Sequence, residues 1–282
     1  MIKCASAPNL NAPGKPVDFS MLRVSVISFS AFDSPQKFFD EAALCIERAA
    51  REGAQLVVLP NLALPIPRET FITFFSALAR RAHIYLAPGT LLERQGDSLF
   101  NTAYLFAADG KLVGTQRQTH RSPQEIAQGF APGDELNVFD IGSARIGFVI
   151  GTDVEYPEVS RILALQDANV LIHPAAYATW SREHFLRDLW REVQANQVFG
   201  VQACIVGKGQ SAIYAPVEMT PDHRGVLAQS DTSDIISALL DFDALQRVID
   251  AYPIFDFFNY DLYASQFPSV YLKATEHATR RT

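Results

Sequence analysis

Short apolar runs alternate with segments of helical periodicity along this chain, and that alternation limits the folds open to it. Residues 22–29 read LRVSVISF, a run rich in β-branched side chains, and residues 55–60 read QLVVLP, a continuous apolar run typical of a strand buried on both faces. Between them, residues 38–52 place apolar side chains at helical spacing and stop before Gly53. The pattern predicts an α/β fold.

The alternation continues toward the C-terminus. A hairpin is predicted by the A-D-G turn at residues 108–110, which lies between the strand-like segments 101–106 and 111–116. Hairpins mixed with parallel units predict a layered sandwich, and no G-x-G-x-x-G opens a helix, so no dinucleotide cofactor is expected. We expect further helices at 70–82, 157–166 and 182–196, and further strands at 84–88, 144–150, 169–172, 198–206, 210–214 and 235–240.

Length and composition predict one globular domain. The chain has 282 residues, of which 48% are hydrophobic and 20% charged, values ordinary for a packed core. We expect a single domain over residues 21–272, an N-terminal arm over 1–20 and a C-terminal tail over 273–282. The N-terminal arm has no apolar stretch of the kind that a signal peptide requires.

Charge and cysteine content exclude several classes of partner. A net charge of −7 and a pI near 5.4 argue against nucleic acid and anionic membranes. No apolar run approaches the ~20 residues that span a bilayer. Cys4, Cys45 and Cys204 show no metal spacing and no disulfide framework, and H-E-x-x-H is absent. We therefore expect no metal, no cofactor and a cytoplasmic location.

Residues 146–158 read IGFVIGTDVEYPE and contain the most informative residue of the chain, Gly151. The segment resembles the nucleophile strand of the nitrilase, or carbon–nitrogen hydrolase, superfamily, usually I-G-x-x-I-C-Y-D-x-x-F-P-E. The resemblance runs from about Leu22 to about Tyr271 and implies an α/β fold in the form of a four-layer α-β-β-α sandwich. It also implies a glutamate base, a lysine and a nucleophilic cysteine. Here glycine, which has no nucleophilic side chain, takes the cysteine's place.

The other two chemical positions also depart from the family pattern. The glutamate motif L-V-V-x-P-E reads LVVLPN and ends at Asn61. The lysine motif G-x-x-x-G-x-x-R-K-x-H reads GKLVGTQRQTH over residues 110–120, with Gln118 in place of lysine. Taken singly, Asn61 fits a turn residue and Gln118 a surface residue. Taken with Gly151, they predict a neutral, hydrogen-bonded pocket floor without catalytic groups.

Five more residues are expected near the pocket. The second glutamate of the family, which positions the lysine and the substrate, corresponds to Glu125, although S-P-Q-E also fits a first helical turn. Thr152 adjoins Gly151, but neighbouring residues of a strand point to opposite faces. Asp153 is expected to hold the strand-to-helix turn, and His173 to face the pocket or, more typically, to be a hydrogen-bonded core histidine. The set is Glu125, Thr152, Asp153, His173 and Tyr177.

Two classes of function follow. The first is a catalytically inactive nitrilase-like protein that binds a small molecule or a protein, or has a structural role. The second is an amide or nitrile hydrolase with a non-standard arrangement, such as an Asp153–His120 or Glu155–His173 dyad, or one that uses Cys204. Cys204 is expected to be a packed core side chain.

A homodimer is the expected assembly. Family members dimerise through the helices that here correspond to residues 157–166 and 182–196. Residues 252–263 are also unusually aromatic, as the centres of interfaces are. We expect this segment to seal part of the interface.

Overall fold

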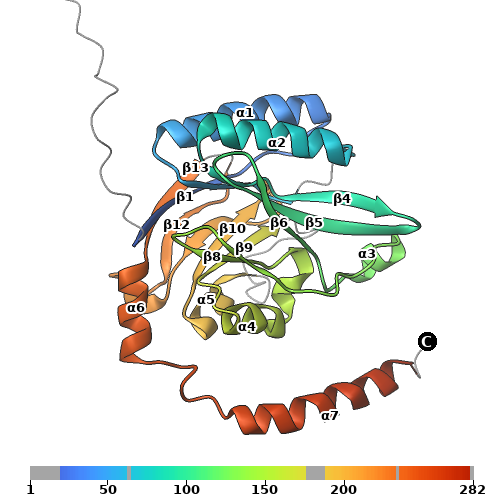
Figure 1. The fold of residues 1–282 in the computed structure, drawn as a ribbon, viewed down its shortest axis with the longest axis vertical. Helices are drawn as coiled ribbons and strands as arrows, with labels where there is room; N and C mark the ends of the chain where they lie inside the picture. The colour runs from blue at the N-terminus through green and yellow to red at the C-terminus, as the bar shows by residue number, and fades with distance from the viewer. Residues whose placement is uncertain (1–19, 62–64, 176–187, 233–234, 280–282) are drawn as a thin grey trace, which may run out of the picture.

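The computed structural model describes residues 20–61, 65–175, 188–232 and 235–279, with side chains described as far as Leu272. Residues 1–19 of the expected N-terminal arm, and Tyr177 of the expected pocket, lie outside the described residues. Two β-sheets lie face to face, with helices on both outer sides (Figure 1). The α-β-β-α sandwich is therefore confirmed.

The first sheet combines parallel and antiparallel strands. β1, β2 and β3 are parallel, β13 pairs with β1 in the antiparallel sense, and β5 forms antiparallel ladders with β3, β4 and β6. The ladder between β5 and β6 is the predicted hairpin. The strands are β1 (Met21–Ile27), β2 (Leu56–Val58), β3 (Tyr85–Ala87), β4 (Thr90–Gln95), β5 (Ser98–Phe106), β6 (Leu112–Arg117) and β13 (Ile235–Asp241).

The second sheet has the strand order β12-β11-β10-β9-β8-β7. β8, β9 and β10 are parallel, so their carboxyl ends lie at one edge of the sheet, where the turn after β8 begins. The strands are β7 (Val138–Asp140), β8 (Arg145–Phe148), β9 (Val170–Ala175), β10 (Phe199–Cys204), β11 (Ser211–Tyr214) and β12 (Val226–Ser230).

Helices cover both sheets. α1 and α2 lie on the first sheet, and α4 and α5 lie on the second (Figure 1). Ser34 caps α1 by accepting from the Lys37 amide, and Pro35 follows at the first helical position. The helices are α1 (Pro35–Arg51), α2 (Arg68–Ala82), α3 (Pro123–Ala127), α4 (Pro157–Leu165), α5 (Trp190–Asn196), α6 (Phe242–Ala251) and α7 (Tyr260–Thr279), with 3₁₀ turns at Gly151–Glu155 and Val217–Met219.

Apolar side chains fill the space between the sheets and beneath both helical layers. Phenylalanines dominate the layer under α1 and α2, where the rings of Phe38, Phe71 and Phe75 are fully buried. On the other side, α4 packs directly on β8, because a Cβ at Gly147 would lie 3.0 Å from Leu163 Cδ1. The absent side chain at Gly147 therefore sets how closely α4 approaches the strand that leads to Gly151.

Most predicted elements are present, and their boundaries shift by a few residues. The helix expected over 182–196 is described only from Trp190, because residues 176–187 lie outside the description. α7 continues to Thr279, past position 273 where the tail was expected to begin, and it projects from the body of the protein (Figure 1). No helix in the described ranges is both long and apolar enough to cross a bilayer.

Candidate functional site

The ends of β6 and β8 meet at one point of the structure. β8 stops at Phe148, and the 3₁₀ turn that begins at Gly151 follows it. Gly151 has φ +52°, a left-handed conformation that favours glycine. A Cβ added there would lie 3.4 Å from Gln118 Oε1 and 3.5 Å from Gln118 Nε2. The structure therefore places positions 151 and 118 in contact.

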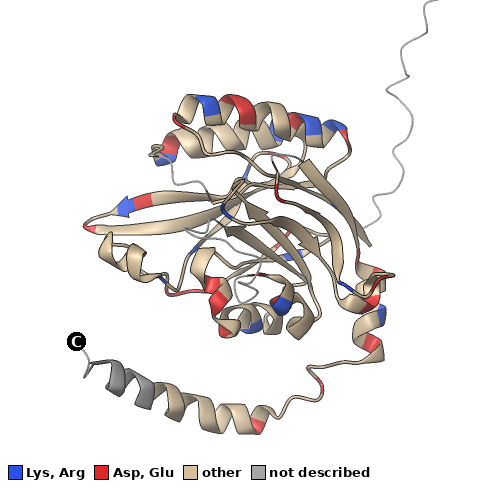
Figure 2. Ribbon diagram, turned by 180° about the vertical axis from the view of Figure 1, so that it is seen from behind, with Lys and Arg blue, Asp and Glu red and all other residues tan. Residues whose placement is uncertain are grey.

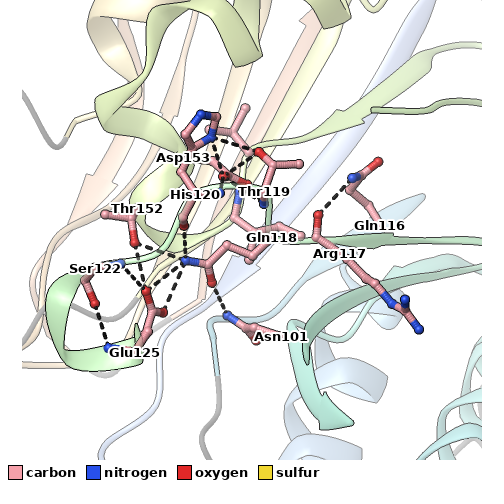
Figure 3. A network of polar contacts seen from close by, with 12 residues as sticks. Asn101, Gln116, Arg117, Gln118, Thr119, His120, Ser122, Glu125, Thr152 and Asp153 are labelled. Atoms are coloured by element: carbon pink, nitrogen blue, oxygen red, sulfur yellow. Dashed lines mark hydrogen bonds and ion pairs between the residues drawn. The ribbon is translucent and has the colours of Figure 1, made fainter. Parts of the chain in front are cut away.

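Gln118 is the centre of a polar network (Figure 3). It is 3% exposed, so its interpretation as a surface residue is wrong. Its Oε1 accepts from Asn101 Nδ2 at 2.7 Å. Its Nε2 faces four oxygens, namely His120 O at 2.7 Å, Thr152 Oγ1 at 3.0 Å, and Glu125 Oε2 and Oε1 at 3.1 and 3.2 Å.

Glu125 is both a residue of a first helical turn and a neighbour of Gln118, so both interpretations of Glu125 from the sequence hold. It is the third residue of α3 and forms a capping box with Ser122, whose amide donates to Glu125 Oε2 at 2.7 Å. The same carboxylate contacts Gln118 Nε2 and accepts from Thr152 Oγ1 at 3.1 Å. The cap therefore orients Glu125 toward Gln118, and the carboxylate remains half-buried.

Thr152 lies beside Gln118 rather than on the opposite face. The expectation that it would point away assumed that the strand continues, and this assumption was wrong because the backbone turns into a 3₁₀ helix at Gly151. Its hydroxyl accepts from Gln118 Nε2 and donates to Glu125 Oε2.

Asp153 holds the turn after β8 against the segment after β6. Its carboxylate is fully buried and accepts from the backbone amides of Thr119, His120 and Ile150 at 3.0, 2.7 and 3.2 Å. The Thr119 hydroxyl adds a fourth donor at 2.8 Å. These contacts agree with the structural role expected for Asp153.

His120 contacts Asp153 but does not complete a nucleophilic triad with Thr119. Its Nδ1 lies 3.3 Å from Asp153 Oδ1 and 2.9 Å from Thr119 Oγ1. A triad places the nucleophile and the orienting acid on different ring nitrogens, whereas here both share Nδ1. The ring also stacks on Tyr156, with the ring centroids 3.8 Å apart.

His173 is a hydrogen-bonded core histidine, as expected. Its side chain is fully buried, and Nδ1 lies 2.5 Å from the Val149 carbonyl oxygen. Burial lowers the pKa of His173 to about 4, against the opposing effects of the Val149 carbonyl and the Asp153 charge. The ring is therefore neutral at pH 7. Glu155, the proposed partner in a dyad, is exposed.

The two described cysteines are poor nucleophiles. Cys204 is 1% exposed, as predicted for a core side chain, and burial raises the pKa of its thiol far above the neutral range. Burial also raises the pKa of the half-buried Cys45. Cys4 lies outside the described residues.

Asn61 is positioned at the end of β2 by the start of β4. Its Oδ1 accepts from Thr90 Oγ1 at 2.7 Å, and the two residues also form a backbone bridge. Gly89 makes this approach possible, since any Cβ there would clash with the Pro60 carbonyl oxygen. The described side-chain hydrogen bond of Asn61 therefore joins Thr90 and not Gln118.

Sequence reasoning missed one member of the network, Asn101. Asn101 Nδ2 supports Gln118, yet in the sequence it is simply one residue of a predicted strand. Only the pairing of β5 with the segment after β6, where the Gln118 amide donates to the Asn101 carbonyl, brings the two side chains together. Within the described residues, no group of three or more His, Cys, Asp or Glu side chains is arranged to hold a metal ion.

Known proteins resemble this chain in sequence and in fold. The family model described as carbon-nitrogen hydrolase matches residues 26–249. A nitrilase of Pyrococcus abyssi is 36% identical over 158 residues, which span 50% of this chain and 59% of that protein. A citrullinase of Francisella tularensis is 26% identical over 80% of this chain and 91% of its own length. The crystal structure of Saccharomyces cerevisiae Nit3, a member of the nitrilase superfamily, has a TM-score of 0.73 at 26% identity and covers 83% of this chain and 95% of its own. The chain therefore belongs to the carbon–nitrogen hydrolase family of the nitrilase superfamily.

Proposed function

We propose that this protein binds a small molecule at the site formed by Gln118, Glu125, Gly151 and Thr152, and that it does not hydrolyse carbon–nitrogen bonds. The observation that carries the proposal is the contact between positions 151 and 118. A side chain at position 151 would touch the end of the Gln118 side chain, and glycine offers no nucleophile there.

The remaining polar groups do not replace the missing nucleophile. Cys204 is buried and its raised pKa keeps the thiol protonated. Gln118 carries no charge with which to stabilise an oxyanion, and Asn61 has no proton-accepting carboxylate. The residues that the family resemblance assigns to the chemistry therefore support binding without turnover.

One observation favours the alternative, a hydrolase of altered mechanism. The Thr152 hydroxyl donates to the Glu125 carboxylate at 3.1 Å, which is the contact that a hydroxyl nucleophile makes with a base. A carboxylate is a weak base toward an alcohol, because their pKa values lie far apart. We therefore rank this function second.

Turnover measurements separate the two functions. The wild-type protein is incubated with primary amides, nitriles and carbamoyl-amines, and intact mass is measured after exposure to an electrophilic acyl reagent. We expect no product above buffer and no adduct at position 152. Product formation that disappears in Thr152→Ala and Glu125→Gln would overturn the proposal in favour of the alternative.

A variant that restores the three chemical groups provides the positive control. Asn61→Glu, Gln118→Lys and Gly151→Cys are combined, and folding is verified by thermal melting. A mass adduct on this variant, with none on the wild type, is the expected result. An adduct of equal yield on the wild type would contradict the absence of a nucleophile.

A second copy of the chain is the proposed partner, and α7 is its proposed contact. A groove of about 1120 Å³ lies between α4 and α7. Phe267 and Tyr271 remain about half exposed, and Asp261 is the one charged residue within 260–272 (Figure 2). An apolar surface of this kind favours association. Light scattering is expected to report a dimer that Phe267→Ala weakens, whereas a monomer at tens of micromolar would contradict the proposal.

A further inference from the structure

The surroundings of Gln118 contain more hydrogen-bond acceptors than donors. A primary amide nitrogen has two hydrogens, yet four oxygens lie within 3.2 Å of Gln118 Nε2. Those oxygens belong to His120, Glu125 and Thr152. Two hydrogens cannot satisfy four acceptors at full strength, so the network is short of donors.

The Glu125 carboxylate bears a negative charge that no described cation balances. Its hydrogen bonds come from Gln118 Nε2, the Ser122 amide and the Thr152 hydroxyl, all of which are neutral groups. The nearest basic residue in sequence, Arg121, donates to the Phe130 carbonyl instead. Oε1 receives a single long hydrogen bond, at 3.2 Å, and so keeps accepting capacity.

The shortage of donors extends one residue deeper. The carboxylate holds the Gln118 amide nitrogen on its own side, so Gln118 Oε1 faces Asn101 and requires a donor from it. Asn101 supplies its Nδ2, which leaves its Oδ1 buried with no hydrogen-bond partner among the described residues. Asn101 is 2% exposed, so its Oδ1 is shielded from solvent that could otherwise donate a hydrogen bond to it.

The network remains within reach of a ligand. Glu125, Gly151 and Thr152 are half-buried rather than enclosed, and a Cβ at position 151 would come no closer than 3.4 Å to the Gln118 amide. A group that enters there meets the Gln118 amide, whose nitrogen is hydrogen-bonded to the Glu125 carboxylate and the Thr152 hydroxyl. A donor-rich cation gains charge-assisted hydrogen bonds at such a place, whereas an anion meets repulsion.

We propose that this site selects ligands with a cationic, donor-rich head group, an ammonium or an amidinium, over carboxylates. The proposal rests on the small-molecule binding proposed above and specifies the ligand that the site takes. Three hydrogens and a positive charge supply what the network around Glu125 lacks.

Three probes of matched size test the proposal, namely n-butylammonium, butyramide and butyrate. Their dissociation constants are measured by titration calorimetry or ligand-observed NMR at pH 7.5. We expect n-butylammonium to bind at least 10-fold more tightly than butyrate, with butyramide between them. Glu125→Gln, which retains the capping-box geometry, is expected to remove this preference.

Two further variants make the result specific to the site. Gln118→Lys places an ammonium among the four oxygens and is expected to abolish binding of n-butylammonium. Glu69→Gln makes the same change in net charge on the exposed surface of α2 and is expected to leave the preference intact. Thermal melts establish that each variant is folded.

The outcomes separate this inference from the proposed function. If butyrate or butyramide binds as tightly as n-butylammonium, the cationic preference is wrong while small-molecule binding stands. A second outcome is that no probe binds and that the melting temperature measured with each probe is the same for Glu125→Gln and the wild type. In that case both the cationic preference and the proposed small-molecule binding are wrong. An equal effect of Glu69→Gln and Glu125→Gln would show general charge attraction and overturn the site assignment.

Discussion

Two carboxylates lie close to the segment after β6, and they differ in what surrounds them. Asp153 is fully buried and accepts from three backbone amides and one hydroxyl. Glu125 is half-buried and accepts from one backbone amide and two side chains. Backbone donors are present whatever the sequence, whereas side-chain donors are lost by a single substitution. Single substitutions of neighbouring residues therefore remove few of the hydrogen bonds of Asp153, whereas they can remove most of those of Glu125.

The largest effect is expected when the two carboxylates are truncated in parallel. Asp153→Ala leaves several buried donors without an acceptor, and we expect it to lower the free energy of unfolding by about 4 kcal/mol. Glu125→Ala leaves partly solvated donors and is expected to cost about 1 kcal/mol. Urea denaturation of both variants provides the measurement, and equal losses would remove the distinction between the two regions.

The pH dependence of stability tests the structural region a second way. Because the pKa of buried His173 is lowered from 6.5 to about 4, the unfolded chain binds a proton in this range that the folded chain does not. The contribution of His173 to the free energy of unfolding is therefore fully present above pH 6.5. It is lost as the pH decreases toward 4, which lowers stability by about 3 kcal/mol. His173→Gln is expected to flatten this part of the curve relative to wild type. If the stability of the variant depends on pH in the same way as that of the wild type, the pKa of His173 is not lowered by folding.

An intermediate effect is expected at Gln118. Gln118→Leu removes a donor from Glu125 and the acceptor for Asn101 Nδ2, so we expect a loss of about 2 kcal/mol. Gln124→Leu on the exposed surface of α3 serves as the matched control and is expected to change stability by less than about 0.5 kcal/mol. Thermal unfolding of both variants compares the two glutamines directly, and similar shifts would place Gln118 outside the network.

The smallest effect is expected at Gly151. A Cβ there makes ordinary contacts with Gln118, so the cost of Gly151→Ala comes from the left-handed backbone alone. We expect about 1 kcal/mol of destabilisation and unchanged folding cooperativity. A loss of several kcal/mol in denaturant titration would mean that no side chain fits beside Gln118.

Local pattern was sufficient to predict the strands and helices that are long and periodic. The runs at residues 22–29 and 55–60 form β1 and β2, and the periodic segment at 38–52 forms α1, because burial on defined faces leaves a readable repeat. The loop motif around Ser122 also identified α3 through its capping box.

Other features depended on tertiary context. β4 and β12 lie at the edges of their sheets and include exposed polar residues. The alternation of apolar and polar residues that identifies a strand is therefore weak in both segments. α6 and α7 follow the last predicted strand and were not predicted as helices. The position of the Thr152 hydroxyl depended on where β8 ends, and residue spacing does not reveal that point.

The tight packing of α4 on β8 at Gly147 has a mechanical consequence. At that position the Leu163 side chain of α4, the helix that borders the groove between α4 and α7, lies directly against the Gly147 backbone of the strand that leads to Gly151. A molecule that associates with α4 therefore contacts a helix packed on the strand that leads into the turn of the proposed binding site. If binding of a compound at the turn is coupled to association at α4, the compound changes the affinity of association by some factor. Association then changes the affinity for the compound by the same factor.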